Sequence, residues 1–247
     1  MIFETKKLKL SSKNIFVYAF SVMGEGKIEN QDSFKIYSDE NQVIIVVADG
    51  LGSAAYSKEG SQRITEVAIE IISNTDDFNG VYLNILNEWK KELEGNINQY
   101  DTTLKFLKIK NDMIVYGGVG DGWISIKSDK GLVLVNMVAE NTFSNQTDSI
   151  LSFNLKEKFS VNEYELSDKL VGLVSTDGFS EDMDKDNSFG LLDGIDKELA
   201  NNEESFIEDT KNTLLNWPVE TNRDDKTVVI FKIEEGEQRD EWCFYWK

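Results

Sequence analysis

Five aspartates in this sequence stand at the ends of strand-like apolar runs. Asp49, Asp121 and Asp177 each end such a run and are followed by glycine, and Asp32 and Asp224 stand just before one. A desolvated carboxylate is costly unless it has a partner, and glycine lets the backbone come close to a ligand. The acids could therefore converge on divalent cations, which bind carboxylate and carbonyl oxygens. Two such ions can activate a water and hold the oxygens of a phosphoryl group during its transfer.

Two simpler interpretations stand beside a metal site. Asp-Gly is a common turn dipeptide, so any one of these acids could be a turn residue or a cap, and spacing alone leaves both interpretations open. A separate stretch, Asp182 to Asp186, places acids at alternate positions and is similar to an EF-hand calcium loop. Asn187 and Asp193 stand where that loop requires glycine and glutamate, so a solvated acidic loop is the preferred interpretation.

The sequence contains no histidine and a single cysteine, Cys243. The lack of histidine excludes Ser-His-Asp and Cys-His nucleophilic catalysis and histidine-rich zinc sites. A metal would be held by oxygen ligands, which suits Mg, Mn or Ca. If the protein is an enzyme, we expect carboxylates and water to carry its chemistry.

The 247 residues carry a formal net charge of −19. Such a chain repels nucleic acid and anionic membranes unless it has a basic patch, and its densest basic cluster is only Lys6, Lys7 and Lys9. The N-terminal segment lacks an apolar stretch of signal-peptide length, and the longest apolar run, 43–48, is far too short to span a membrane. We expect a cytoplasmic monomer that binds neither nucleic acid nor membranes.

Alternation of apolar residues and turn signals predicts many strands and few helices. Helices are predicted around the stripe at 64–72, over 81–93 with Leu83, Leu86 and Trp89 facing inward, and over 203–215. The aromatic tail at 241–247 is expected to pack back on the body. Strands are predicted at 14–22, 33–37 and 42–48, in an antiparallel meander at 103–109, 113–119, 123–127 and 132–138, as a further pair at 161–166 and 170–175, and at 226–233. This grouping favours one α+β domain over residues 1–247.

The acid-bearing segments, taken in order, resemble those of the metal-dependent protein phosphatases of the 2C type, and in particular a bacterial subgroup. The segments are GKIENQDSF at 26–34, VVADGLGS at 46–53, GGVGDGWI at 117–124, STDGFSE at 175–181 and RDDKTVVIF at 223–231. The resemblance implies a four-layer α-β-β-α sandwich, in which two mainly antiparallel sheets are flanked by helices.

The resemblance also implies roles for individual residues. Asp49 would bridge two Mn or Mg ions, and the Gly50 carbonyl would bind one of them. Asp177 and Asp224 would complete the shell of the first ion, and Asp32 would hold the second ion directly or through water. A third, weaker ion would lie near Asp177 and Asp121.

Departures from the family pattern affect the phosphate side of the site. Lys27 stands in the place of a phosphate-binding arginine, so a bidentate fork becomes a point charge, and Arg63 or Arg223 could assist it. Asp225 replaces the asparagine of the family pattern, and Ser53 replaces a glycine. The flap expected at 141–167 is short and differs in sequence from that of the family.

The preferred function is hydrolysis of phosphoserine or phosphothreonine in proteins by direct attack of a metal-bridging water, with Asp49, Asp32 and Lys27 at the catalytic centre. The expected partners are a phosphoprotein substrate and a cognate bacterial kinase system. Two alternatives remain open. One is a non-catalytic domain of the same fold that binds a partner or a phosphopeptide, and the other is a phosphatase of small phosphoesters.

Overall fold

The computed structural model describes residues 1–10, 12–128, 131–136, 147–183, 188–218 and 222–236. Several expectations from the sequence lie wholly or partly outside these residues: the aromatic tail with Cys243, most of the calcium-like loop, and the start of the flap at 141–146. No helix in the described part of the chain has the length and apolar character needed to cross a membrane.

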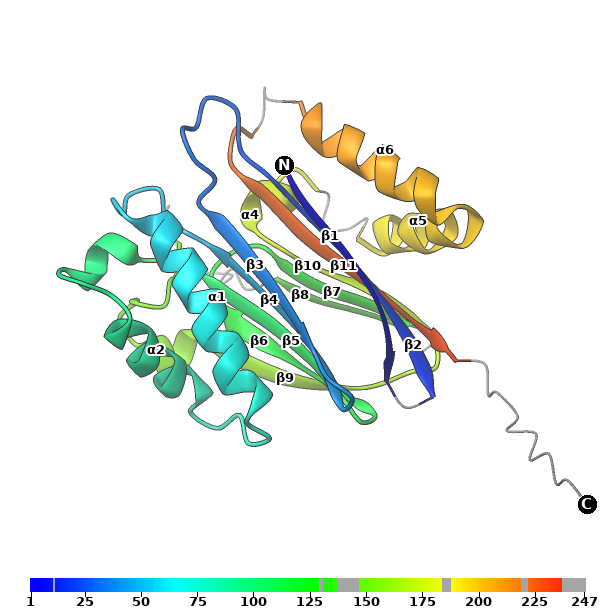
Figure 1. Cartoon of the computed structure of the whole chain (residues 1–247), viewed down its shortest axis with the longest axis horizontal. Coiled ribbons are helices and arrows are strands. Elements are labelled where there is room, and N and C mark those ends of the chain that lie inside the picture. The colour runs from blue at the N-terminus through cyan, green and yellow to red at the C-terminus, as the bar shows by residue number, and fades with distance from the viewer. Residues whose placement is uncertain (11, 129–130, 137–146, 184–187, 219–221, 237–247) are drawn as a thin grey trace, which may run out of the picture.

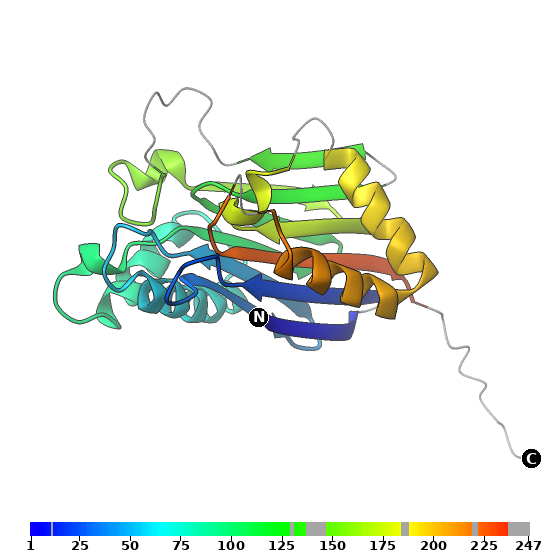
Figure 2. The ribbon, with the colours of Figure 1, turned by 90° about the horizontal axis from the view of Figure 1, so that it is seen from above.

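Two antiparallel sheets form the centre of the molecule (Figure 1). Every strand pairing is antiparallel, and β1 and β8 are the edge strands of the larger sheet, as Figure 2 shows. The six-stranded sheet has the order β1 (Ile2–Leu10), β2 (Lys13–Val22), β11 (Lys226–Glu235), β10 (Leu170–Ser175), β7 (Trp123–Ser128) and β8 (Gly131–Asn136). The five-stranded sheet has the order β3 (Asp32–Ser38), β4 (Gln42–Asp49), β5 (Leu104–Lys110), β6 (Met113–Val119) and β9 (Ser160–Glu165).

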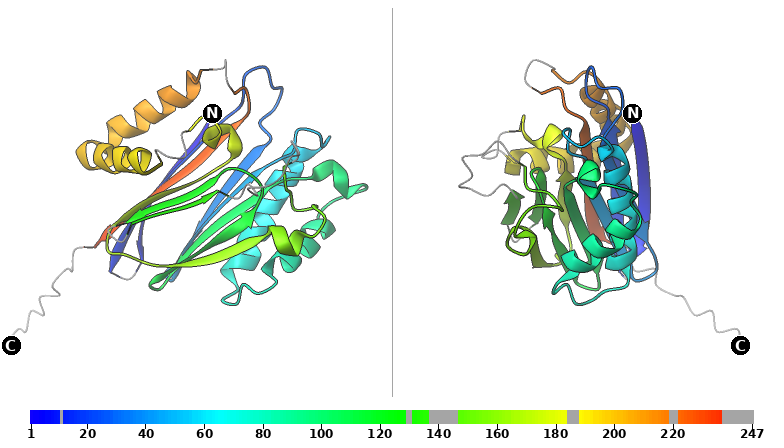
Figure 3. Two further views of the ribbon diagram at one scale, coloured as in Figure 1. Left: turned by 180° about the vertical axis from the view of Figure 1, so that it is seen from behind. Right: turned by 90° about the vertical axis from the view of Figure 1, so that its left-hand side faces the viewer.

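Helices cover the outer face of each sheet, which confirms the predicted α-β-β-α order of layers. The pair α1 (Ser57–Ser73) and α2 (Val81–Lys91) lies on one side, and α5 (Ser188–Asn201) and α6 (Glu203–Leu215) lie on the other (Figure 3). Three short helices complete the described elements: η1 (Ile97–Tyr100), α3 (Leu155–Lys158) and α4 (Asp177–Ser180).

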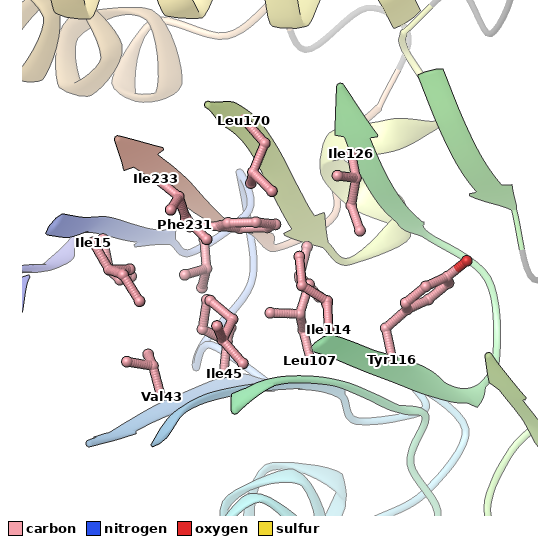
Figure 4. Close-up of a cluster of buried hydrophobic side chains, with 14 of the residues drawn as sticks. Ile15, Val43, Ile45, Leu107, Ile114, Tyr116, Ile126, Leu170, Phe231 and Ile233 are labelled. Atoms are coloured by element: carbon pink, nitrogen blue, oxygen red, sulfur yellow. The ribbon is translucent and has the colours of Figure 1, made fainter. Parts of the chain in front are cut away.

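Strand β4 explains why an uninterrupted apolar run is needed in this fold. Val43 and Ile45 pack into the core between the two sheets (Figure 4), as does Val47, whereas Ile44 and Val46 pack against the helices. A strand that is buried on both faces requires apolar residues at every position. Because Asp49 ends this strand, it lies at the edge of the core, where it is half-buried.

The predicted four-strand meander is wrong, because the chain changes sheets in its middle. Strands β5 and β6 pair in the smaller sheet, whereas β7 and β8 pair in the larger one. The crossing occurs at Gly120-Asp121-Gly122, where the two glycines have φ of 105° and 96°. These left-handed values favour glycine. The turn that carries Asp121 is therefore also the turn at which the chain changes sheet.

Other details of the secondary structure also differ from the prediction. Strands β9 and β10 do not pair with each other, because β9 pairs with β6 and β10 pairs with β7 and β11. In α2 the buried residues are Val81, Ile85 and Trp89, and Leu83 is 47% exposed. Strand β1 and helix α5 were not predicted.

Candidate functional site

The site begins with two acids placed opposite each other at the ends of neighbouring strands. Asp32 starts β3 and Asp49 ends β4, and the antiparallel register makes them partners. Asp32 is buried, with 6% of its surface exposed. Directly opposed like charges repel each other, so this pair requires protons or a cation between the two carboxylates.

The turn after Asp49 brings the chain close to the neighbouring loops. The Gly50 amide donates a hydrogen bond to the Gln31 carbonyl over 3.1 Å, and a Cβ on Gly50 would lie 2.4 Å from the carbonyl oxygen of Ser57. No side chain fits there without a shift of the backbone. Glycine is therefore required at this turn for close packing.

The larger sheet contributes two more of the predicted acids. Asp177 follows β10 directly, and Asp224 stands just before β11, the strand next to β10. The Thr176 hydroxyl donates a hydrogen bond to Asp32 Oδ2 over 2.9 Å, which joins the two sheets at the site. The structure thus brings Asp32, Asp49, Asp177 and Asp224 together.

Burial and mutual repulsion change the ionisation of these acids. Burial, together with the charges of Asp32, Asp177 and Asp224, raises the pKa of Asp49 well above its usual value. Burial raises the pKa of Asp32 to about 7, although hydrogen bonds from Thr227 and Thr176 oppose this rise. Carboxylates that resist ionisation in this way are typical of a functional site.

Asp121 is joined to this group through Asp177. Burial and then the charge of Asp121 raise the pKa of Asp177. Asp121 Oδ2 accepts a hydrogen bond from the Thr147 hydroxyl over 2.9 Å, but its Oδ1 is buried and has no hydrogen-bond partner among the described residues. Asp121 therefore has one oxygen available for a cation.

Lys27 also lies at the site, but its ammonium contacts acids. Its Nζ donates hydrogen bonds to Asp224 Oδ1 and, over 3.1 Å, to Asp225 Oδ2. Burial lowers the pKa of Lys27, but the contacts with Asp224 and Asp225 outweigh burial and raise it overall. Lys27 is thus a firmly charged cation on the Asp224 side of the site.

Asp225 has a clear structural role. Its side chain is fully buried, and its Oδ1 accepts the Gly24 amide while its Oδ2 accepts the Gln31 amide, both over 2.8 Å. These hydrogen bonds hold the loop before β3 against the loop before β11. Asp225 therefore positions Asp32 and Asp224, and both of its oxygens are already occupied.

The two arginines that could assist Lys27 lie elsewhere or are exposed. Arg63 pairs with Glu66 over 3.2 Å on the exposed side of α1, and it lines a hollow that Glu29, Tyr56 and Lys58 also line. Arg223 is an exposed residue directly before Asp224. Of the three basic residues expected on the phosphate side, Lys27 is therefore the one whose side chain contacts the predicted acids.

Sequence analysis missed Lys105, the basic residue buried most deeply beside the acids. Its side chain lies in the middle of the smaller sheet with 1% of its surface exposed, and its Nζ donates a hydrogen bond to the Asp121 carbonyl. Burial lowers the pKa of Lys105, whereas Asp121, Asp177, Asp49 and Asp32 act to raise it. The available signal was a lysine two residues before Leu107 and four before Ile109, on the same face of β5 as these core residues.

The donor set fits a hard divalent ion, although no shell is preformed. Among the described residues, no three acidic, cysteine or histidine side chains stand in the arrangement of a metal site. The available donors are all oxygens, however, and Oδ1 of both Asp32 and Asp121 is buried without a hydrogen-bond partner. Mg and Mn prefer such ligands, and an ion bound between Asp32 and Asp49 would satisfy the Asp32 oxygen.

The two helix-flanked sheets and the acid cluster at their junction are shared features of a known protein family, which comparison of this sequence with known families identifies. The sequence pattern of the family described as protein phosphatase 2C matches residues 25–217. The chain belongs to this family. The match includes Lys27, Asp32, Asp49, Asp121 and Asp177 and ends before Asp224. No curated protein matches the sequence.

Several solved structures share the fold. RsbX in complex with magnesium has a TM-score of 0.65 at 18% identity, covering 94% of this chain and 100% of RsbX. The catalytic domain of the serine threonine protein phosphatase PstP, in complex with 2 manganese ions, has a TM-score of 0.61 at 16% identity, covering 90% and 99%. The S. agalactiae serine/threonine phosphatase has a TM-score of 0.65 at 17% identity, covering 88% and 98%.

Proposed function

We propose that this protein is a metal-dependent phosphatase that hydrolyses phosphoserine or phosphothreonine in proteins. One observation carries the proposal: Asp32 and Asp49 from one sheet and Asp177 and Asp224 from the other meet in a partly buried cluster at the junction of the sheets. Like-charged groups buried together are costly. A divalent cation offsets this cost and gives the cluster a chemical use.

The residues that would hold the ions follow from their positions. Asp49 lies centrally, because Asp32, Asp177 and Asp224 all act on its ionisation. We assign two Mn or Mg ions to these four acids and the Gly50 carbonyl, with Asp121 beside Asp177. Ions bound there would activate a water and offset the charge of the phosphoryl group.

Residues around the acids prepare the site for this role. The Thr176 hydroxyl fixes the orientation of Asp32, and Asp225 fixes the loops that carry Asp32 and Asp224. Lys27 places a positive charge at the more exposed side, where Asp224 has 42% of its side-chain surface exposed. Such a charge would attract a phosphate dianion and hold its outer oxygens.

Two features of the sequence and fold support a protein substrate in a soluble compartment. The strongly acidic chain does not favour nucleic acid, and the structures that share the fold include the serine threonine protein phosphatase PstP and the S. agalactiae serine/threonine phosphatase. We therefore propose a cytoplasmic, monomeric single-domain phosphatase that opposes a bacterial protein kinase.

A non-catalytic, phosphopeptide-binding role is the second candidate, because the Lys27 ammonium contacts Asp224, one of the proposed ion ligands. The test is hydrolysis of an aryl phosphate with Mn present and after exhaustive chelation. The account expects activity that requires Mn or Mg. Binding of phosphopeptides without any turnover would support the second candidate, and full activity after chelation would contradict the metal-dependent proposal.

Competition assays address the class of substrate. If the site serves proteins, phosphoserine and phosphothreonine peptides should inhibit aryl phosphate hydrolysis at lower concentration than small phosphoesters do. Stronger inhibition by small phosphoesters or nucleotides would assign the site to small molecules instead.

A further inference from the structure

Lys105 occupies a position where the fold otherwise places apolar residues. Strand β5 lies between β4 and β6 in the smaller sheet. On the same face of this strand, Leu107 and Ile109 pack in the core between the sheets. A buried ammonium is costly unless nearby groups compensate its charge. The structure therefore has to provide negative charge at this point.

The acids of the candidate site provide that charge. The Lys105 ammonium donates a hydrogen bond to the backbone carbonyl of Asp121. The negative charges of Asp121 and then Asp177 raise the pKa of Lys105 more than those of the other acids do, against the lowering by burial. A lysine ammonium has three hydrogens to donate. Asp121 Oδ1 is buried and lacks a hydrogen-bond partner among the described residues, so an acceptor and a cation lie in the same enclosed region.

The neighbouring strand approaches the backbone at Lys105 closely. Gly118 is paired with Lys105 across β5 and β6. A Cβ at Gly118, where φ is 138°, would lie 1.9 Å from the Leu104 carbonyl oxygen and 2.9 Å from the Lys105 Cα. The close approach of the two backbones next to Lys105 thus depends on glycine.

We propose that Lys105 is a fixed cation of the site: its ammonium balances Asp121 and Asp177 and keeps a divalent ion from binding between them. Divalent ions are then confined to the cluster formed by Asp32, Asp49, Asp177 and Asp224, away from Asp121. This inference rests on the proposed function, because it assumes that the same acids hold ions. The Lys105 ammonium then takes the place near Asp177 and Asp121 where a third, weaker ion was expected.

Lys108 provides a matched control on the same strand. It is also buried, with 2% of its surface exposed, but it lies on the opposite face of β5. Its Nζ donates hydrogen bonds to the carbonyls of Ile72 and Thr75 at the end of α1. Loss of Lys108 removes a buried ammonium of the same strand without changing the charge at the acid cluster.

The experiment measures Mn binding to the wild type, Lys105→Met, Lys105→Gln and Lys108→Met by equilibrium dialysis. Both Lys105 variants should bind about one more Mn per chain than the wild type, because Asp121 and Asp177 then lack a cation and offer oxygen ligands. Lys108→Met should bind as many ions as the wild type. Lys105→Gln can still donate a hydrogen bond to the Asp121 carbonyl, so it separates charge from hydrogen bonding.

Thermal unfolding provides a second readout that does not depend on activity. In chelator, both Lys105→Met and Lys108→Met should melt at a lower temperature than the wild type, because each loses the hydrogen bonds of a buried ammonium. Saturating Mn should raise the Tm of Lys105→Met most of the way to that of the Mn-bound wild type. The Tm of Lys108→Met should stay as far below the wild type as it is in chelator. If Lys105→Met does not fold in chelator, Lys105→Gln is used for the same comparison.

The outcomes separate this inference from the proposed function. If the wild type binds Mn and the Lys105 variants bind the same number of ions, Lys105 is not a substitute for an ion and only this inference is overturned. If Lys105→Gln matches the wild type while Lys105→Met gains an ion, hydrogen bonding replaces charge as the explanation and the inference is also overturned. If no variant binds Mn, the metal-dependent function falls as well.

Discussion

The Asp225 carboxylate accepts a hydrogen bond from the backbone amide of Gln31 over 2.8 Å, one residue before Asp32. Its other oxygen accepts the amide of Gly24. A buried carboxylate can accept hydrogen bonds from two amides at once because both of its oxygens are acceptors. The negative charge of Asp225, which departs from the family pattern, is thus used to fix the two loops that carry Asp32 and Asp224.

Asp225→Asn should destabilise the protein although it restores the residue of the family pattern. An asparagine has one acceptor oxygen, so its NH₂ group would face either the Gly24 or the Gln31 amide. We expect the free energy of unfolding to fall by about 1–3 kcal/mol, the cost of an unsatisfied buried group. Urea unfolding measures this, with the exposed Asp112→Asn as control. Equal stability of the two variants would contradict the assigned role.

Lys27 should contribute to capture of the phosphate. Lys27→Ala should lower kcat/KM for an aryl phosphate by about 1–3 kcal/mol in transition-state stabilisation, the scale of a lost charge-assisted hydrogen bond. Lys27→Arg should preserve or raise kcat/KM, because it keeps the charge and adds a fork of donors. The control is Lys35→Ala, a lysine paired with Glu66 on the surface. Values equal to wild type for both Lys27 variants would remove Lys27 from the phosphate side of the site.

Asp49→Asn should abolish tight binding of at least one ion. The substitution keeps the shape of the side chain but removes its charge, and we expect the rate to fall by roughly 10²-fold or more. The fold should survive, because in the absence of ions the change relieves repulsion among four acids. Calorimetric titration with Mn and steady-state rates check both statements. Wild-type turnover in this variant would reject Asp49 as the central ligand.

Without ions, the protein should be more stable in mild acid than at neutral pH. The pKa of Asp32 is about 7 in the folded protein and about 3.9 in an unfolded chain. Between these values the folded state holds more protons, so the free energy of unfolding decreases as pH rises from about 4 to about 7. In chelator, the difference in urea midpoint between the wild type and Asp32→Asn should change over this range in that direction. A pH-independent difference would contradict the burial of an ionisable Asp32.

The acids of the site could be predicted because their signal is local. At β4 and at β10 an apolar strand stops at an acid and a glycine, and the structure places Asp49 and Asp177 close enough to affect each other. Strand lengths and helix stripes are equally local, and the α+β class followed from the grouping of these elements, whereas the order of layers came from the resemblance to the 2C-type phosphatases. Such features depend on neighbours within a few residues.

The assignment of strands to sheets could not be predicted from spacing. The turn at Gly120-Asp121-Gly122 looks like a hairpin, but the chain passes from one sheet to the other there. Strand β1 was missed because Lys6, Lys7 and Lys9 suggested only a charged cluster. Leu8 and Leu10 alternate with these lysines and pack on the core, and charged side chains are usual on an edge strand.

The positions of the charged partners depend on contacts distant in sequence. Lys105 contacts a carbonyl 16 residues later, and Asp225 bonds an amide 194 residues earlier. A lysine in a strand is usually solvated, so only the fold shows that Lys105 is buried among acids. Helix α5 was a different case, because Leu192, Ile195 and Leu199 form a buried stripe that was visible in the sequence.

The most direct test of the account is anomalous diffraction from crystals of the protein soaked in Mn. The account predicts Mn peaks about 2.0–2.6 Å from carboxylate oxygens of Asp49, with Asp32, Asp177 or Asp224 completing each shell and no peak between Asp121 and Asp177. Well-ordered carboxylates at the junction of the sheets without any Mn peak at Asp49 would contradict the central claim that these acids form a divalent metal centre.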